Sequence, residues 1–137
     1  MKIESKIHKI ENSDEYVYNF ISDFRNFKDL IPQEKVSDWN ATSDKAEFSL
    51  EGIGKVGLQI AEKQPYKLVK ISNQETVPFD FFLWIQLKKV EENDTRVKIT
   101  IKADFNPIVK EKKKKPLQQF ADTLAEQMSV YFSNRTI

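Results

Sequence analysis

The sequence contains no cysteine and a single histidine, His8, among its 137 residues. Disulfide bonds, thiol nucleophiles and cysteine-ligated zinc are therefore excluded, and a Ser-His-Asp triad would depend on His8 alone. Alternation along residues 2–10 places His8 with Lys2, Glu4 and Lys6 on the polar side of a strand, so we expect it at the surface. We predict no catalytic residue, no metal site and no cofactor, which favours a binding protein over an enzyme without deciding between them.

Glycine is also scarce, and all three glycines fall in one hexapeptide, GIGKVG, at residues 52–57. The hexapeptide matches the G-x-G-x-x-G string of dinucleotide-binding turns, which requires a helix directly after the glycines to receive the pyrophosphate. Here the next residues, LQIAEKQ, alternate as a strand and reach Pro65. We therefore interpret Gly52 and Gly54 as residues of a hairpin turn, and Gly57 as a bulge or a close approach in the next strand.

The sequence has almost no net charge, with 22 basic and 21 acidic residues. One basic cluster, KEKKKKP at residues 110–116, suits either an anionic surface or a solvated turn, and we favour the turn because no aromatic residue is interleaved with the lysines. We expect no nucleic-acid partner. No apolar run is long enough for a membrane span and no signal peptide is recognisable, so we expect a cytoplasmic protein.

The first third of the sequence predicts a strand followed by two short helices. Residues 2–10 form the strand, with Ile3 and Ile7 on one side. Asn12 or Ser13 caps a helix whose apolar positions recur through Phe24 at helical spacing. A second short helix ends before Pro32.

From residue 36 to residue 105 the apolar period changes to two, which is typical of strands that are buried on one face. The predicted strands are residues 36–41, 45–50, 55–63, 67–72, 79–90 and 95–105. Helical spacing returns between Leu117 and Phe132, and Pro116 either lies in the first turn of this helix or kinks a longer one that begins at Asn106-Pro107. This order predicts an α+β fold, with an antiparallel sheet covered on one face by the long helix.

Three blocks of sequence carry a resemblance to a known superfamily: ENSDEYVYNFISDFRNFKDLIP, FSLEGIGKVGLQIAEKQPYKLVKIS and NDTRVKITIKADFNPIV, followed by the amphipathic last helix. In this order they resemble the SRPBCC, or START-like, helix-grip superfamily, which includes polyketide cyclase/dehydrase-like and birch-pollen-allergen-type proteins. The resemblance implies one domain over residues 1–137, with a curved sheet of about seven strands around the C-terminal helix and two short helices after the first strand. Its compact size is that of bacterial members.

The resemblance also implies a cavity between sheet and helix that holds a hydrophobic small molecule, such as a lipid, an isoprenoid or a polyketide-like compound. Matched by position, the residues expected to line it are Phe20, Phe24, Phe48, Leu58, Ile60, Phe81, Leu83, Ile99, Ile101, Phe120, Leu124 and Met128. Binding or transport of such a ligand is the first hypothesis. A cyclase- or dehydratase-like enzyme is an alternative, although Ser5, Tyr16 and Tyr18 are the few polar groups expected near the cavity.

A third hypothesis comes from the other face of strand 79–90. Phe82 and Trp84 share that face with Asp80 and Gln86, so they are expected to point towards solvent. They either pack under lysine stems from neighbouring strands or form an interaction surface, for instance in a homodimer. The sequence leaves both readings open.

Overall fold

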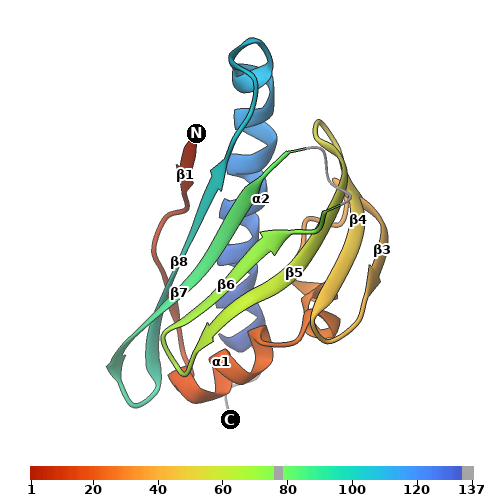
Figure 1. Cartoon of the computed structure of the whole chain (residues 1–137). Coiled ribbons are helices and arrows are strands. Elements are labelled where there is room, and N and C mark those ends of the chain that lie inside the picture. The colour runs from red at the N-terminus through yellow and green to blue at the C-terminus, as the bar shows by residue number, and fades with distance from the viewer. Residues whose placement is uncertain (76–78, 134–137) are drawn as a thin grey trace.

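The computed structural model describes residues 1–75 and 79–133. Eight strands form a curved sheet that wraps around a long C-terminal helix, and two short helices lie near the N-terminus of the chain (Figure 1). The strands are β1 (Lys2–Glu4), β2 (His8–Ile10), β3 (Val36–Ala41), β4 (Lys45–Leu50), β5 (Gly54–Gln64), β6 (Leu68–Asn73), β7 (Phe81–Glu91) and β8 (Asp94–Ala103). The helices are α1 (Asp14–Ile21), the 3-10 helix η1 (Phe24–Asp29) and α2 (Pro107–Ser133). The predicted α+β class and helix-grip-like arrangement are confirmed.

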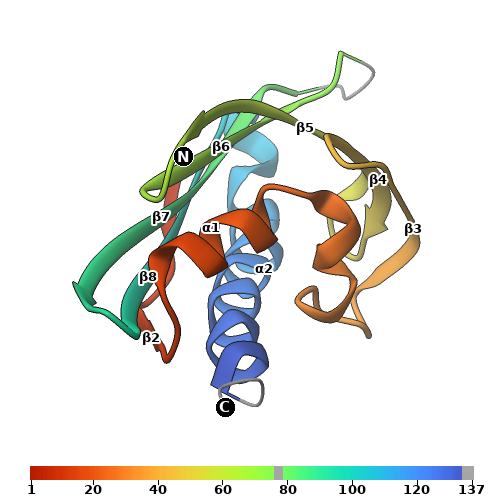
Figure 2. The ribbon, with the colours of Figure 1, turned by 90° about the horizontal axis from the view of Figure 1, so that it is seen from below.

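All strand pairs are antiparallel, in the order β1-β8-β7-β6-β5-β4-β3, and β2 also pairs with β8. Because β1 and β2 occupy the same edge one after the other, the sheet has seven strand positions, as the sequence predicts. Register shifts interrupt β3 near Asp38 and β5 between Ile60 and Glu62, and such bulges increase the local twist. Seen from below, the sheet curves around α2 from β8 and β7 through β6 and β5 to β4 and β3 (Figure 2).

The N-terminal edge differs from the single strand predicted over residues 2–10. At Ser5 the side chain replaces a backbone acceptor, because Ser5 Oγ accepts a hydrogen bond from the Ile99 amide at 2.9 Å. The register then moves by one residue, from Glu4 opposite Thr100 to His8 opposite Val97. This shift reverses the alternation. Ile7, expected beside Ile3 in the core, is 65% exposed, and His8, expected on the polar face, lies half-buried on the side of the core.

The two short helices follow the predicted capping signals. Ser13 caps α1, since its Oγ accepts a hydrogen bond from the Tyr16 amide. Phe24, expected at the end of this helix, instead begins η1, where its ring packs edge-on against Phe27. Leu30 and Ile31 follow η1 and are buried, so the spacing of buried apolar residues continues up to Pro32 as the sequence indicates.

The glycines of GIGKVG lie in the β4–β5 hairpin, as predicted. Gly52 and Gly54 have φ values of +88° and +105°, which favour glycine. The chain continues as β5 after Gly57, so the helix that a dinucleotide site requires is replaced by a strand. Gly57 marks a close approach, because a Cβ atom there would lie 3.2 Å from the side chain of Gln74.

The long helix α2 begins at Pro107, and Asn106 Oδ1 accepts a hydrogen bond from the Ile108 amide at this end. The longer of the two predicted helices is thus correct, and Pro116 lies inside it. The lysine cluster, expected in a turn, is helical. α2 packs mainly along β8, β2 and β1. Among the described residues, no helix has an apolar stretch of the length needed to cross a bilayer.

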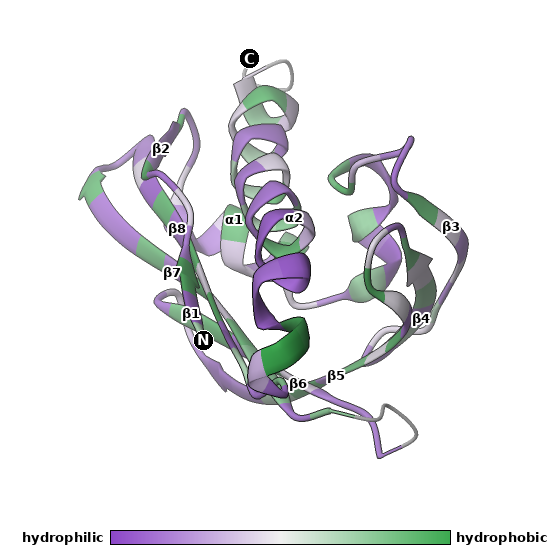
Figure 3. Cartoon of the chain, turned by 90° about the horizontal axis from the view of Figure 1, so that it is seen from above, coloured by the Kyte–Doolittle hydropathy of each residue, from purple (hydrophilic) through white to green (hydrophobic). Residues whose placement is uncertain are grey.

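The core lies between the concave face of the sheet, α1, η1 and α2. Hydrophobic and hydrophilic residues alternate along the strands, whereas the first turns of α2 after residue 109 are mostly hydrophilic (Figure 3). On the convex face Phe82 is 39% exposed, and its ring lies 4.6 Å from Lys70 Nζ. Lys70 also lies over Trp84, at 5.7 Å, so the lysine packing considered for this face is present.

Candidate functional site

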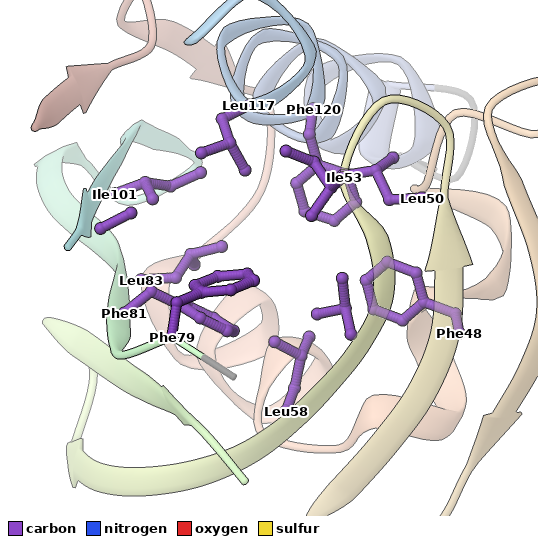
Figure 4. A pocket seen from close by; sticks show the side chains of 12 residues that line it. Phe48, Leu50, Ile53, Leu58, Phe79, Phe81, Leu83, Ile101, Leu117 and Phe120 are labelled. Carbon is purple, nitrogen blue, oxygen red and sulfur yellow. The ribbon is translucent and has the colours of Figure 1, made fainter. Parts of the chain in front are cut away.

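An apolar cavity lies between the concave face of the sheet and the middle of α2, beside the β4–β5 turn (Figure 4). β4, β5, β7 and β8 supply its walls, and α2 closes it from above in Figure 4. The lining residues are Phe48, Leu50, Ile53, Val56, Leu58, Phe79, Phe81, Leu83, Ile101, Ala103, Leu117 and Phe120. All are hydrophobic, so the cavity offers contact and exclusion of water rather than hydrogen bonds.

Local packing explains where the cavity forms. Phe120 stacks on Phe48 with ring centroids 5.9 Å apart, and Phe48 leans against Trp39 at 5.3 Å. On the opposite side, Phe79 contacts the rings of Phe81 and Phe105. Two groups of aromatic rings thus lie on opposite sides of the cavity.

The room between these side chains is small, about 30 Å³. A water molecule needs roughly 10 to 15 Å³ measured in this way, so the cavity as it stands would admit at most a few atoms. A drug-sized ligand occupies a pocket of roughly 300 to 1,000 Å³. A larger ligand must therefore displace lining side chains.

The structure brings together six of the twelve residues predicted to line the site. These six are Phe48, Leu58, Phe81, Leu83, Ile101 and Phe120. The other six, Phe20, Phe24, Ile60, Ile99, Leu124 and Met128, lie outside the lining. Of these, Ile99, Leu124, Met128 and Phe24 are fully buried in the core, whereas Phe20 is half-buried and packs against Tyr131 and Phe132. Ile60 is half-buried beside the bulge in β5.

Six further lining residues were missed by the sequence reasoning. Three of them, Leu50, Val56 and Ala103, lie two positions from a predicted lining residue on the same strand and therefore share its face. The period of two contains the signal for these three residues. Leu117 belongs to the apolar stripe of α2. Phe79 stands two residues before Phe81 in the predicted strand 79–90, so the period of two contains the signal for it as well. Ile53 lies in a turn, where periodicity gives no signal.

The polar groups expected near the cavity lie elsewhere. The Ser5 hydroxyl is engaged by the backbone of residues 6 and 99, and Tyr16 is half exposed on α1. Tyr18 is buried, but it packs against Tyr66. The described lining therefore supplies no general acid or base. Within residues 1–75 and 79–133, no cluster of three or more histidine, cysteine or carboxylate side chains is placed to hold a metal ion.

No protein-family model matches the sequence, and no curated protein matches it either. Solved structures do. The protein XoxI from Bacillus cereus is 14% identical with a TM-score of 0.75, and the match covers 98% of this chain and 96% of that one. A protein from Thermus thermophilus is 14% identical with a TM-score of 0.74 over 100% of both chains. A START superfamily protein from Mycobacterium smegmatis is 12% identical with a TM-score of 0.69, covering 98% of this chain and 99% of that one. At these identities the similarity shows the fold, which is START-like.

Proposed function

We propose that this chain, which has a START-like fold, binds a hydrophobic small molecule in the cavity between its sheet and α2. The observation that carries the proposal is a wholly apolar cavity between the concave face of the sheet and α2. A lipid, an isoprenoid or a polyketide-like compound suits this lining, because burial of apolar surface contributes about 25 cal/mol per Å². The START superfamily neighbour supports a ligand-binding fold.

Binding would have to enlarge the cavity. The side chains best placed to move are Phe120 and Leu117, which project from one helix, since a rotation or a small shift of α2 displaces both together. Such rearrangement lowers the net affinity, because lining side chains give up their packing contacts. We therefore expect moderate affinity for a flexible ligand that can fill an irregular space.

The two tryptophans provide the test, since Trp39 contacts the lining residue Phe48 whereas Trp84 lies on the convex face under Lys70. Trp84→Phe leaves Trp39 as the reporter of the cavity, and Trp39→Phe leaves Trp84 as the matched control. We expect titration with decan-1-ol, geraniol or an aromatic polyketide to change the emission of the Trp84→Phe variant saturably. The emission of the Trp39→Phe variant should stay constant.

Native mass spectrometry of the purified protein supplies a second measurement, because a co-purified ligand adds a discrete mass. If no added mass is found and none of the three compounds changes the Trp39 emission, the proposal is wrong.

The cyclase- or dehydratase-like alternative gains no support from the described lining, which carries no ionisable side chain. Self-association through Phe82 and Trp84 has one observation in its favour, the exposed part of the Phe82 ring.

A further inference from the structure

A second hollow adjoins the apolar cavity and shares a wall with it. This groove lies between the segment after η1, the β4–β5 turn and α2, and its volume is about 220 Å³. It is lined by Pro32, Glu34, Lys35, Leu50, Glu51, Pro116, Gln119, Phe120 and Thr123. Leu50 and Phe120 line both hollows, so these two side chains separate the apolar cavity from the groove.

The wall between the two hollows consists of two side chains, those of Leu50 and Phe120. Leu50 and Phe120 are 4% and 5% exposed, so each side chain just reaches the surface while its body faces the core. Among the described residues, the ring of Phe120 has one stacking partner, Phe48. A change in the rotamer of Phe120 would join the groove and the cavity into one space.

The outer rim of the groove is built differently on its two sides. The β4–β5 turn is fixed on α2, because Lys113 Nζ donates to the carbonyl oxygens of Gly52 and Ile53 at 3.1 and 3.4 Å and Gly52 packs closely on Pro116. On the side towards η1, Lys35 and Glu51 form an exposed ion pair with 3.7 Å between nitrogen and oxygen, which contributes about 0 to 1 kcal/mol. The Glu51 amide also donates a hydrogen bond to the Lys35 carbonyl oxygen at 2.9 Å, and Val36 pairs with Leu50, so the β3–β4 ladder holds this side of the rim.

The charges of the groove restrict what it can receive. The lining carries two carboxylates, those of Glu34 and Glu51, and one ammonium group, that of Lys35, which is paired with Glu51. A bound anion would add to the negative charge of this lining, whereas a hydroxyl group can donate to a carboxylate or accept from Gln119 or Thr123. The groove therefore suits an uncharged, hydrogen-bonding group.

From this juxtaposition we infer that the groove is the entrance to the cavity and that the ligand is an amphipathic alcohol. Its chain lies behind Leu50 and Phe120, and its hydroxyl group stays in the groove near Glu34, Glu51, Gln119 and Thr123. The inference rests on the proposed function, since it requires that the cavity binds a ligand.

The route can be tested because the chain contains no cysteine. Gln119→Cys, in the groove, and Glu92→Cys, in the distant β7–β8 turn, are each introduced into the Trp84→Phe background. Each variant is measured before and after attachment of a bulky maleimide, by stopped-flow detection of Trp39 emission on mixing with decan-1-ol. We expect modification at residue 119 to slow association at least fivefold and modification at residue 92 to leave it unchanged.

The head group is tested by comparing decan-1-ol with decanoate. Like charges about 4 Å apart in water repel by about 1 kcal/mol, so the alcohol should bind roughly fivefold more tightly than the carboxylate. The double variant Glu34→Gln/Glu51→Gln should reduce this difference.

The outcomes separate the two proposals. Unchanged association after modification of residue 119, or tighter binding of decanoate than of decan-1-ol, overturns the entrance and the alcohol while the binding function stands. If the unmodified Trp84→Phe protein responds to no ligand of the panel, the binding function itself fails, and the inference fails with it.

Discussion

At the scale of single residues, the two glycines with positive φ in the β4–β5 hairpin differ in how much a side chain at each position would cost. Gly52 and Gly54 both have positive φ, but a Cβ atom on Gly52 would lie 2.6 Å from Cγ of Pro116, whereas open space surrounds Gly54. The strain of a positive φ is common to both positions, and the steric overlap is specific to Gly52.

We therefore predict that Gly52→Ala destabilises the protein more than Gly54→Ala. The Gly54 substitution should cost about 1 to 2 kcal/mol from the backbone alone. The Gly52 substitution should cost more, because the β4–β5 turn or α2 must also move. Urea unfolding of both variants measures the difference, and equal midpoints would show that Pro116 yields without cost.

At the scale of elements, the edge of the sheet depends on the Ser5 side chain, which takes the place of a backbone hydrogen-bond acceptor. Ser5 Oγ accepts from the Ile99 amide, donates to the Lys6 carbonyl oxygen and is buried. Because Ser5 Oγ accepts in place of a backbone oxygen, the pairing register with β8 can shift by one residue between β1 and β2.

Ser5→Ala should therefore lower the free energy of unfolding by about 1 to 3 kcal/mol, since it leaves the Ile99 amide buried without an acceptor. Hydrogen exchange at that amide should accelerate as well. Ser37→Ala, at an exposed position of β3, is the control and should change stability by less than about 0.5 kcal/mol. A Ser5 variant as stable as the control would mean that water or a rearranged strand satisfies the amide.

The same edge shows why the sequence predicted most elements but not all. The strands at residues 36–41 and 45–50 match their predictions to the residue. Alternation is unbroken in the second, where Ala46, Phe48 and Leu50 are buried, whereas the register shift near Asp38 interrupts the first without changing its bounds. The break at Ser5 is invisible to alternation, since a serine reads as polar whether it faces water or caps an amide. Ile7 and His8 were consequently assigned to the wrong faces.

The site was predictable to a similar degree. Phe48, Leu58, Leu83 and Ile101 share the concave face, which the period of two identifies. Whether a concave residue meets a void or another side chain depends on where α2 lies across the sheet. Ile99 and Ile101 are two residues apart on β8, yet the second lines the cavity and the first is packed in the core.

At the scale of the whole molecule, the convex face carries the Phe82 and Trp84 rings that the interaction hypothesis invokes. Lys70 lies over Phe82 and Trp84, and Lys102 lies 6.0 Å from the Trp84 ring. In a dimer through this face the lysines of both copies would meet, and like charges oppose such contact. These side chains also shield the rings from a partner.

We accordingly expect a monomer by light scattering up to high concentration. Lys70→Ala/Lys102→Ala should increase association, because it uncovers the rings and removes the repulsion. Lys88→Ala/Lys89→Ala, further along β7, is the matched control for loss of two charges. A dimer of the unaltered protein that Trp84→Thr dissociates would instead establish the interaction hypothesis.

The pairing of β1 with β8 also bears on how the protein folds. Lys2 lies opposite Lys102, so the edge of the sheet joins segments that are far apart along the chain. Closing so long a loop costs entropy before any contact compensates for it, and folds rich in such contacts form slowly, in milliseconds to seconds. During synthesis β1 leaves the ribosome long before its partner, and α2 follows later still. Until then the concave face that builds the cavity is open to water, and for that interval it is a surface for chaperones or for aggregation.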